Sequence, residues 1–446
     1  MRAQMMNFPL TITHLFERAR ALFAKREIVT RKTDRTLHRT DYATVHARAS
    51  KLAHALTRLG VKSGDRVATL AWNTHRHFEL YLAVPSMGAV LHTLNLRLHP
   101  NEIGYIARHA EDKVIVVDES LVPLLAKFVH MVPSVERVIV MRDGDTPVAE
   151  GYLDYESLLA VESETYPWPA LDENTAGMIC YTSGTTGNPK GVVYSHRALV
   201  LHTLVACTAD ALGVCEADTL LPVVPMFHAN AWGLPFCAVA VGAKVVMPGP
   251  HLDPASLLEL MANEKVTVAA GVPTIWLGIL ALLDKEPSRW DLSTIRSMVI
   301  GGSAAPAAMI DGFRKRHRLE VTHAWGMTET TPLGTLARVK ASLGDITDEE
   351  RLKIRASQGY AMPFVEIRHV DDDGKVLAWD GRTMGELEVR GPWVASGYLG
   401  GDGAEKFTRD GWFKTGDVVT IDPEGYMRIT DRAKDVVKSG GEWISS

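Results

Sequence analysis

Residues 181–190, YTSGTTGNPK, combine four Thr or Ser hydroxyls and two glycines with a single charge on Lys190. In a glycine-rich loop, backbone N–H groups can converge on an anion, while hydroxyls add donors and a lysine adds positive charge. The segment is not a Walker A loop, because Asn188 and Pro189 separate Gly187 from Lys190. Taken alone, it is compatible with a phosphate site and equally with a flexible surface loop.

Three later stretches have a similar character. The segment GGSAAP, 301–306, follows an apolar run and predicts a strand-to-helix turn, with Pro306 where the helix begins. In HAWGMTETTP, 323–332, Glu329 is a candidate Mg²⁺ ligand, because Mg²⁺ takes few protein carboxylates and completes its shell with phosphate oxygens and water. In WFKTGD, 412–417, Asp417 follows a glycine and can accept hydrogen bonds from ribose hydroxyls.

Each of these residues also has a simpler interpretation. A single carboxylate is more often solvated or a helix cap, a Gly-Asp pair more often a turn, and an isolated Trp or His more often part of the core. These simpler interpretations apply to Glu329, Asp417, Trp325, Trp232, Lys434, Lys438 and His228. The order and combination of the motifs therefore matter more than any one residue.

The composition limits the class of protein. A chain of 446 residues with 46% hydrophobic and 23% charged residues predicts an ordinary folded protein of two or three structural units. A net charge of −5 without a long basic run argues against a dedicated nucleic-acid binder, so small-molecule partners are expected. The four cysteines show no CxxC spacing and predict reduced, buried thiols in a cytoplasmic protein, without a zinc site or disulfides.

Two long uncharged runs, 219–243 and 266–283, resemble membrane spans in length. Proline, glycine and polar residues interrupt both, so we expect them to form core elements, and we expect no integral membrane segment. The first residues carry no uncharged apolar stretch before a small-residue cleavage site, unlike a secretory signal.

The elements that must position these residues alternate between strands and helices. Between residues 40 and 320, short apolar runs separated by helical segments predict α/β architecture, with parallel sheets covered by helices. After residue 330 the pattern alternates apolar and polar residues around an Asp-Gly turn, which predicts an antiparallel barrel or sheet. Residues 339–358 predict an exposed helix.

In this order, YTSGTTGNPKGV, GGSAAP, WGMTET, TGD and DRAKDVVKSGGEWIS resemble the core motifs of the AMP-forming adenylating superfamily, which includes acyl-CoA synthetases, peptide-synthetase adenylation domains and luciferases. The resemblance covers essentially the whole chain. It implies a large N-terminal domain, 1–429, of two layered sheets with a small antiparallel β-barrel at about 335–429. Residues 430–446 would form the hinge and the start of a mobile C-terminal domain that is absent from this chain.

The resemblance also implies roles for individual residues. The phosphate loop would comprise Thr182, Ser183, Gly184, Thr185, Thr186, Gly187 and Lys190, with Thr182 and Glu329 near Mg²⁺. The adenine pocket and α-phosphate contacts would come from Gly302, Ser303, His323, Ala324, Trp325, Gly326, Met327 and Thr328. Trp325 departs from the Tyr often found there, although either ring can stack on adenine. Asp417 and Arg432 would bind the ribose, Lys434 would be the hinge residue, and Lys438 would approach the phosphates.

The acyl substrate would lie near His228, with Trp232 at the position that gates the acyl tunnel in fatty-acyl members. Ala229, Gly302 and Gly334 are small neighbours that would admit an alkyl chain. The catalytic set implied is Thr182, His228, Thr328, Glu329 and Lys438. Because residues 221–240 contain no Arg or Lys to pair with a second carboxylate, we expect a monocarboxylic acid.

The resemblance implies a cytoplasmic, homodimeric acyl-CoA synthetase that uses ATP, Mg²⁺ and CoA. The amino-acid sequences of the motifs are most similar to those of medium- or long-chain fatty-acyl members, a subgroup that includes ligases for 3-methylmercaptopropionate. Alternatives are a carrier-protein ligase, a luciferase-like oxygenase, or a nucleotide-binding protein without turnover. Family members continue for roughly a further hundred residues and thereby supply a second lysine, so this chain alone is expected to adenylate slowly.

Overall fold

The computed structural model describes residues 1–446 except 2, 145–146, 183–186, 433–436, 440–441 and 445–446, with side chains described up to residue 430. The chain divides into two compact units. Unit 1 comprises Met1–Leu204, Cys215–Ala217 and Pro225–Pro250, and unit 2 comprises Val205–Val214, Asp218–Val224 and His251–Ser446.

The main sheet of unit 1 has the order β7-β6-β5-β3-β4-β8-β9. Every neighbouring pair is parallel except β8 and β9. Its strands are β3 (Arg66–Leu70), β4 (Val90–Thr93), β5 (Asp112–Asp118), β6 (Arg137–Met141), β7 (Leu153–Asp154), β8 (Ala176–Tyr181) and β9 (Gly191–Ser195). The helices of unit 1 are α1 (Ile12–Phe23), α2 (Tyr42–Arg58), α3 (His75–Ser86), α4 (Pro100–His109), α5 (Val122–Leu125), α6 (Tyr155–Ala160) and α8 (Leu234–Val241).

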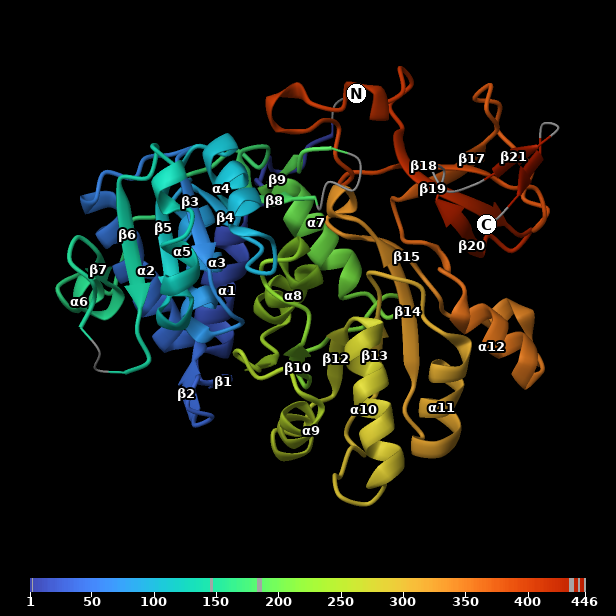
Figure 1. The fold of residues 1–446 in the computed structure, drawn as a ribbon, viewed down its shortest axis with the longest axis horizontal. Coiled ribbons are helices and arrows are strands. Elements are labelled where there is room, and N and C mark those ends of the chain that lie inside the picture. Colours follow the sequence, from blue (N-terminus) through green and yellow to red (C-terminus); the bar gives the residue numbers. More distant parts are fainter. Residues whose placement is uncertain (2, 145–146, 183–186, 433–436, 440–441, 445–446) are drawn as a thin grey trace. The chain divides into compact units, whose positions relative to one another are not determined.

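Helices cover both faces of this sheet (Figure 1). Alternate residues of a strand point to opposite faces, so Ala68 and Leu70 of β3 pack with α4 in one core cluster, while Val67 and Thr69, which alternate with them, are buried on the other face. Burial on both faces explains why the strands are apolar runs rather than alternating patterns. Three further strands of unit 1 pair with one another: β1 (Glu27–Arg31) is parallel to β11 (Lys244–Met247) and antiparallel to β2 (Leu37–Asp41).

The parallel strands of unit 2 are β10 (Thr219–Pro222), β12 (Val268–Gly271), β13 (Ser297–Ile300) and β14 (Val321–Gly326). Helices α9 (Pro254–Asn263), α10 (Pro273–Lys285) and α11 (Ala307–His317) alternate with them along the chain and flank them in Figure 1. Pro306 is the residue before α11, as the turn motif predicts. Two antiparallel strands, β15 (Leu333–Leu336) and β16 (Tyr360–Ala361), continue from β14.

A separate antiparallel sheet lies in unit 2. It contains β17 (Glu366–Val370), β18 (Gly385–Arg390), β19 (Phe413–Ile421) and β20 (Met427–Arg432) in sequential order. Before it, α12 (Asp348–Ala356) buries none of its residues, which confirms an exposed helix over the second half of the predicted segment 339–358. A short hairpin of β21 (Val437–Ser439) and β22 (Glu442–Ile444) follows. The α/β fold class with an added small antiparallel sheet is confirmed.

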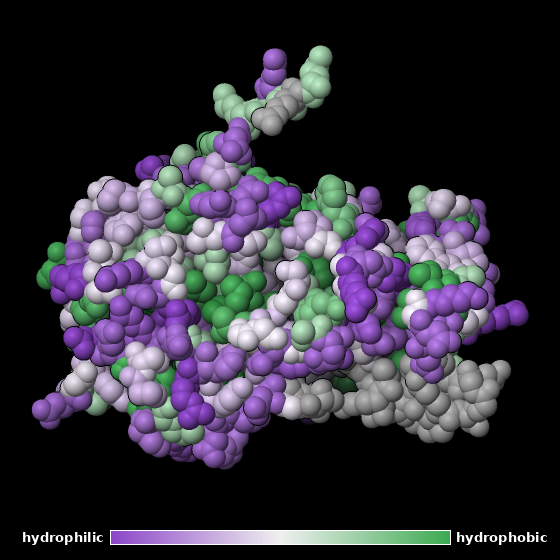
Figure 2. All heavy atoms as spheres, turned by 90° about the horizontal axis from the view of Figure 1, so that it is seen from above, coloured by the Kyte–Doolittle hydropathy of each residue, from purple (hydrophilic) through white to green (hydrophobic). Residues whose placement is uncertain are grey.

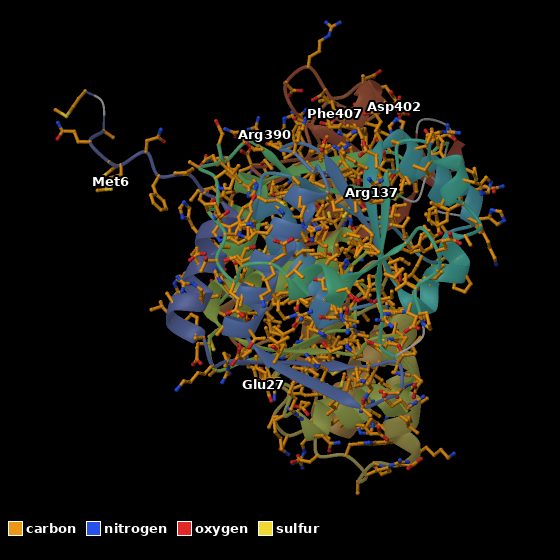
Figure 3. The ribbon with its side chains drawn as sticks, turned by 90° about the vertical axis from the view of Figure 1, so that its left-hand side faces the viewer. Met6, Glu27, Arg137, Arg390, Asp402 and Phe407 are labelled. Carbon is orange, nitrogen blue, oxygen red and sulfur yellow. The ribbon has the colours of Figure 1, made fainter. Side chains whose placement is uncertain are left out.

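The uncharged runs form strands and helices inside the two units, including α8 and α10. Within the part of the chain that the structure describes, no helix has the length and apolarity needed to cross a membrane. The surface in Figure 2 is mostly hydrophilic, with hydrophobic residues scattered over it. Figure 3 shows Met6 on an N-terminal segment that extends away from the rest of unit 1.

The cysteine prediction is correct in part. No disulfide joins the four cysteines, and Cys180 and Cys237 are buried as expected. Cys215 is exposed and Cys207 is partly buried, so the prediction of four buried thiols is wrong. Both lie near the end of α7 (His196–Ala206) and in the loop after it, where apolar neighbours in sequence do not imply a core position.

Candidate nucleotide and acyl site

The predicted phosphate loop connects two antiparallel strands, β8 and β9. Thr182 N–H donates to the Lys190 carbonyl at 2.9 Å, and the Lys190 N–H donates to the Thr182 hydroxyl at 3.3 Å. These two bonds close the base of the loop, so Thr182 and Lys190 face each other across it. Gly187 has a φ of 151°, which a residue with a side chain rarely adopts. Ser183, Gly184, Thr185 and Thr186 lie outside the described residues.

Tyr181, the residue before the loop, is held by side chains that the sequence did not single out. Its hydroxyl lies 2.7 Å from Nδ1 of His109 at the end of α4, and its ring lies 5.1 Å from the His92 ring. His92 is buried against Asp112, with 2.8 Å between Nδ1 and Oδ1. The strand end that leads into the phosphate loop is therefore anchored on one side by a helix and on the other by a buried histidine–aspartate pair.

The predicted acyl segment of unit 1 has an unusual backbone. Ala229, Asn230, Ala231 and Trp232 all have φ between 41° and 57°, and Gly233 follows at 77°. Each left-handed non-glycine residue costs about 1–2 kcal/mol, so the surrounding packing must hold the segment in place. Asn230 is fully buried, and its Oδ1 accepts from the Cys180 thiol at 3.2 Å.

His228 precedes this run. Its side chain reaches the surface of unit 1, so it is not a core histidine, which was the alternative interpretation. Desolvation by the surrounding chain, with a smaller effect of the Arg97 guanidinium, lowers its pKa. His228 is therefore expected to be neutral near pH 7, a state in which the imidazole can either donate or accept a hydrogen bond. Ala229 is buried and Trp232 is partly buried.

In unit 2, the predicted adenine-site residues follow the ends of two adjacent parallel strands. Gly302 and Ser303 come after β13, are exposed, and Gly302 has a φ of 81°. His323 on β14 is buried, and burial lowers its pKa. Because β13 and β14 pair in parallel, these residues lie at the carboxyl edge of the sheet, where α/β folds bind ligands.

Trp325 makes a contact that links this edge to the antiparallel sheet. Its indole Nε1 donates to Oδ2 of Asp417 on β19 at 3.0 Å, and both side chains are buried. Gly334 on β15 lies against the indole ring, since a Cβ atom there would be 2.5 Å from Cζ3 of Trp325. Ala324, the neighbouring adenine-site candidate, is also buried. The predicted adenine and ribose residues, Trp325 and Asp417, are therefore in direct contact.

The segment after Trp325 turns back sharply. A Cβ atom on Gly326 would lie 2.0 Å from the Pro332 carbonyl oxygen, so only glycine fits there. Met327 N–H donates to that same carbonyl at 3.1 Å, and Thr328 opens a short 3₁₀ turn, Thr328–Thr330. This turn buries Glu329, whose Oε1 accepts from the Tyr398 hydroxyl at 2.6 Å. Tyr398 was not identified from the sequence. The signal that could have found it is an aromatic residue between two glycines in the stretch SGYLG.

The remaining candidates lie near the end of the chain. Arg432 on β20 pairs with Asp417 on β19 in the strand register, and Lys438 lies on β21 opposite Trp443. Lys434 lies outside the described residues. Thr182, Lys190, His228, Ala229 and Trp232 belong to unit 1, whereas the adenine, ribose and carboxylate candidates belong to unit 2. The structure groups the predicted residues into these two sets.

Comparison with known proteins identifies relatives along the whole chain. The family model described as "AMP-binding enzyme" matches residues 16–399. A long-chain-fatty-acid–CoA ligase of Thermus thermophilus is 49% identical over 444 residues, covering 99% of this chain and 80% of that protein. A 3-methylmercaptopropionyl-CoA ligase of Ruegeria lacuscaerulensis is 44% identical, covering 100% of this chain and 83% of that protein.

A solved structure has the same fold. The anthranilate CoA ligase AuaEII, crystallised with anthranoyl-AMP, superposes with a TM-score of 0.86 at 25% identity. The match covers 98% of this chain and 80% of that one.

Proposed function

Because this chain belongs to the AMP-binding enzyme family and is an AMP-forming acid–thiol ligase, we propose that its substrate is a fatty or other alkyl monocarboxylic acid. The acid is converted to an acyl-adenylate and then to its CoA thioester. The observation that carries this proposal is the near-complete match to a long-chain-fatty-acid–CoA ligase at 49% identity, over a chain that keeps all five motifs.

The reaction has two steps, adenylation of the acid and transfer of the acyl group to CoA. A carboxylate oxygen of the acid attacks the α-phosphorus of ATP, and the bond to the β-phosphate oxygen breaks to release pyrophosphate. The CoA sulfur then attacks the acyl carbon, AMP leaves with the bridging oxygen, and the thiol proton passes to solvent. Neither step needs a covalent intermediate on the protein, so the chain contributes positioning and charge stabilisation.

The nucleotide is assigned to the residues of the five motifs. Lys190 and the loop from Thr182 supply donors to the β- and γ-phosphates, and Thr328 donates to the α-phosphate. Trp325, with Gly302, Ser303, His323, Ala324, Gly326 and Met327, forms the adenine pocket, and Asp417 with Arg432 binds the ribose. The contact between Trp325 and Asp417 supports this assignment, because adenine and ribose are adjacent parts of one ligand. Lys438 approaches the phosphates, and Lys434 serves as the hinge.

Magnesium is assigned to Glu329 and Thr182. Both offer hard oxygen ligands, and Mg²⁺ usually takes one or two protein carboxylates with phosphate oxygens and water completing its octahedron. The described residues contain no cluster of three or more His, Cys, Asp or Glu side chains arranged for a metal, which fits an ion held largely by the nucleotide. When bound, the ion neutralises charge on the phosphates. The buried, hydrogen-bonded carboxylate of Glu329 is suited to this role.

The acid is assigned to the His228 segment. A neutral imidazole beside an apolar run can hydrogen-bond one carboxylate, and Ala229, Trp232, Gly302 and Gly334 are the residues assigned to the alkyl chain. A 3-methylmercaptopropionyl chain is a second candidate, because a ligase for it is 44% identical to this chain.

The proposal also includes a homodimer, a cytoplasmic location, and the domain boundaries 1–429 and 430–446.

A substrate panel tests the assignment. The protein is incubated with Mg·ATP, CoA and monocarboxylic acids of increasing chain length, together with 3-methylmercaptopropionate and a dicarboxylic acid. Acyl-CoA and AMP are quantified by mass spectrometry. Preference for an alkyl monocarboxylic acid is expected, and preference for the dicarboxylic acid would contradict the proposal.

A further inference from the structure

Trp325 and Asp417 are joined by a hydrogen bond that ties the end of β14 to β19. The indole Nε1 donates to Oδ2 of Asp417 at 3.0 Å, with the Trp325 side chain 6% exposed and Asp417 1% exposed. A hydrogen bond between a buried donor and a buried carboxylate is stronger than an ordinary neutral one. This bond therefore restricts how the Asp417 carboxylate can rotate.

Gly334 makes room for the indole. β15 pairs antiparallel with β14, with Thr335 opposite Trp325 and Leu333 opposite Gly326, so Gly334 lies beside the ring. A Cβ atom on Gly334 would lie 2.5 Å from Cζ3 and 2.7 Å from Cε3 of Trp325, and an alanine there would have to displace the ring. Position 334 therefore requires a glycine, because a side chain there would clash with the six-membered ring of the Trp325 indole.

The backbone of Asp417 is also fixed. Its N–H donates to the Thr415 hydroxyl at 3.0 Å, and its strand position is opposite Arg432. With the backbone held and Oδ2 bonded to the indole, Oδ1 has a set direction. A carboxylate that recognises ribose hydroxyls needs such a set direction, because a hydrogen bond weakens steeply with misalignment.

We propose that Trp325 is a positioning residue for ribose recognition: through its N–H it orients Asp417, and so sets how strongly the site prefers a ribonucleotide over a deoxyribonucleotide. This inference rests on the proposed function, which assigns the ribose to Asp417. It gives Trp325 a role that ring stacking alone does not require. A phenyl ring can stack on adenine, whereas it has no N–H to orient a carboxylate.

The two roles of Trp325 can be separated by comparing ligands. Stacking on adenine contributes equally to AMP and to its 2′-deoxy and 3′-deoxy forms, because the base is the same in all three. The ratio of their dissociation constants therefore reports the ribose contact alone. Loss of a hydrogen bond to a charged group typically costs about 10- to 100-fold in affinity.

The experiment measures the three dissociation constants by isothermal titration calorimetry for the wild-type protein and for Trp325→Phe. In the wild type, AMP is expected to bind about tenfold or more tightly than the weaker deoxy form. In Trp325→Phe, this ratio is expected to fall to within about threefold, whatever the change in AMP affinity itself. The matched control is Trp276→Phe, because Trp276 is a fully buried indole in the same unit that donates to the Gly271 and Val299 carbonyls. It should keep the wild-type ratio.

A second variant moves the indole without removing it. Gly334→Ala is expected to reduce the ratio as Trp325→Phe does, because the added methyl group displaces the ring. Thermal unfolding of each variant checks that the fold is retained. In an Asp417→Asn background, adding Trp325→Phe should change the ratio no further.

The outcomes are distinct. If Trp325→Phe remains folded and keeps the wild-type ratio, the positioning role is wrong even though AMP binds. If the wild-type protein does not bind AMP at all, the proposed function itself fails. If Trp276→Phe lowers the ratio as much as Trp325→Phe, the effect is a general loss of packing, and the inference is overturned.

Discussion

The hydroxyl of Tyr398 donates to Oε1 of Glu329 at 2.6 Å, and both side chains are buried. The backbone is held as well, because the Ala395 N–H donates to the Glu329 carbonyl at 2.8 Å. Tyr398 is itself fixed by aromatic neighbours, with ring centroids 5.6 Å from Phe407 and 6.5 Å from Phe413. Glu329 is therefore a carboxylate held in one orientation before any metal arrives.

Removal of this hydroxyl should loosen the metal ligand. We expect Tyr398→Phe to weaken Mg·ATP binding about tenfold, because Glu329 loses a charge-assisted hydrogen bond that fixes its rotamer. Calorimetry with Mg·ATP and with metal-free AMP measures this, and AMP affinity should stay unchanged. The matched control is Tyr426→Phe, which removes a hydroxyl that donates to the Arg338 carbonyl in the same unit. Equal losses in the two variants would count against a specific role.

Removal of the carboxylate charge tests the metal assignment directly. We expect Glu329→Gln to weaken Mg-dependent ATP binding while AMP binding is largely retained, because an amide keeps the shape of the side chain but is a poorer Mg²⁺ ligand. Titrations of ATP with and without Mg²⁺ measure the effect. Unchanged Mg-dependence would show that Glu329 does not bind the metal.

The tight turn at Gly326 predicts a strong steric effect. In Gly326→Ala the new methyl group would meet the Pro332 carbonyl oxygen at 2.0 Å, so the backbone between Trp325 and Thr328 must move. We expect a loss of stability of about 1–3 kcal/mol and a loss of nucleotide binding. Gly397→Ala is the control, since a Cβ atom there has no neighbour within 4 Å. Urea unfolding and AMP titration of both variants check the contrast, which fails if both behave alike.

Asp118 at the end of β5 should make stability depend on pH. Burial raises the pKa of Asp118 to about 7, although its carboxylate accepts the Trp72 N–H at 2.6 Å. The folded state therefore binds a proton that the unfolded state releases above about pH 4. The free energy of unfolding should fall by about 4 kcal/mol as the pH rises from about 4 to about 7, and level off above that.

Asp118→Asn should remove this dependence while keeping an oxygen for the Trp72 N–H. Urea unfolding at several pH values, with the wild type and the variant side by side, measures the difference between the two curves. Parallel curves across this range would contradict the raised pKa.

Several strands and the start of one helix could be predicted from the sequence. Runs such as those of β5, β6 and β13 are apolar because both faces of each strand are buried, so their pattern needs no knowledge of distant partners. Pro306 marked the start of α11 for an equally local reason, because a proline fits where the first helical N–H groups have no partner.

The contacts within the site were not predictable in this way. Tyr398 reaches Glu329 across 69 positions and Trp325 reaches Asp417 across 92, and the spacing of residues in one sequence does not reveal such pairs. The left-handed run beginning at Ala229 was also missed, since alanine and tryptophan rarely adopt it and only the surrounding packing selects it.

Activation of a carboxylic acid as its adenylate is the reaction on which the other assignments depend. The most direct measurement mixes the protein with Mg·ATP labelled at the α-phosphate and an alkyl monocarboxylic acid, without CoA, and detects acyl-AMP by mass spectrometry. Acid-dependent acyl-AMP and pyrophosphate are expected, with conversion to acyl-CoA and free AMP once CoA is added. Formation of ADP and phosphate in place of AMP and pyrophosphate, or of AMP independent of the acid, would contradict it.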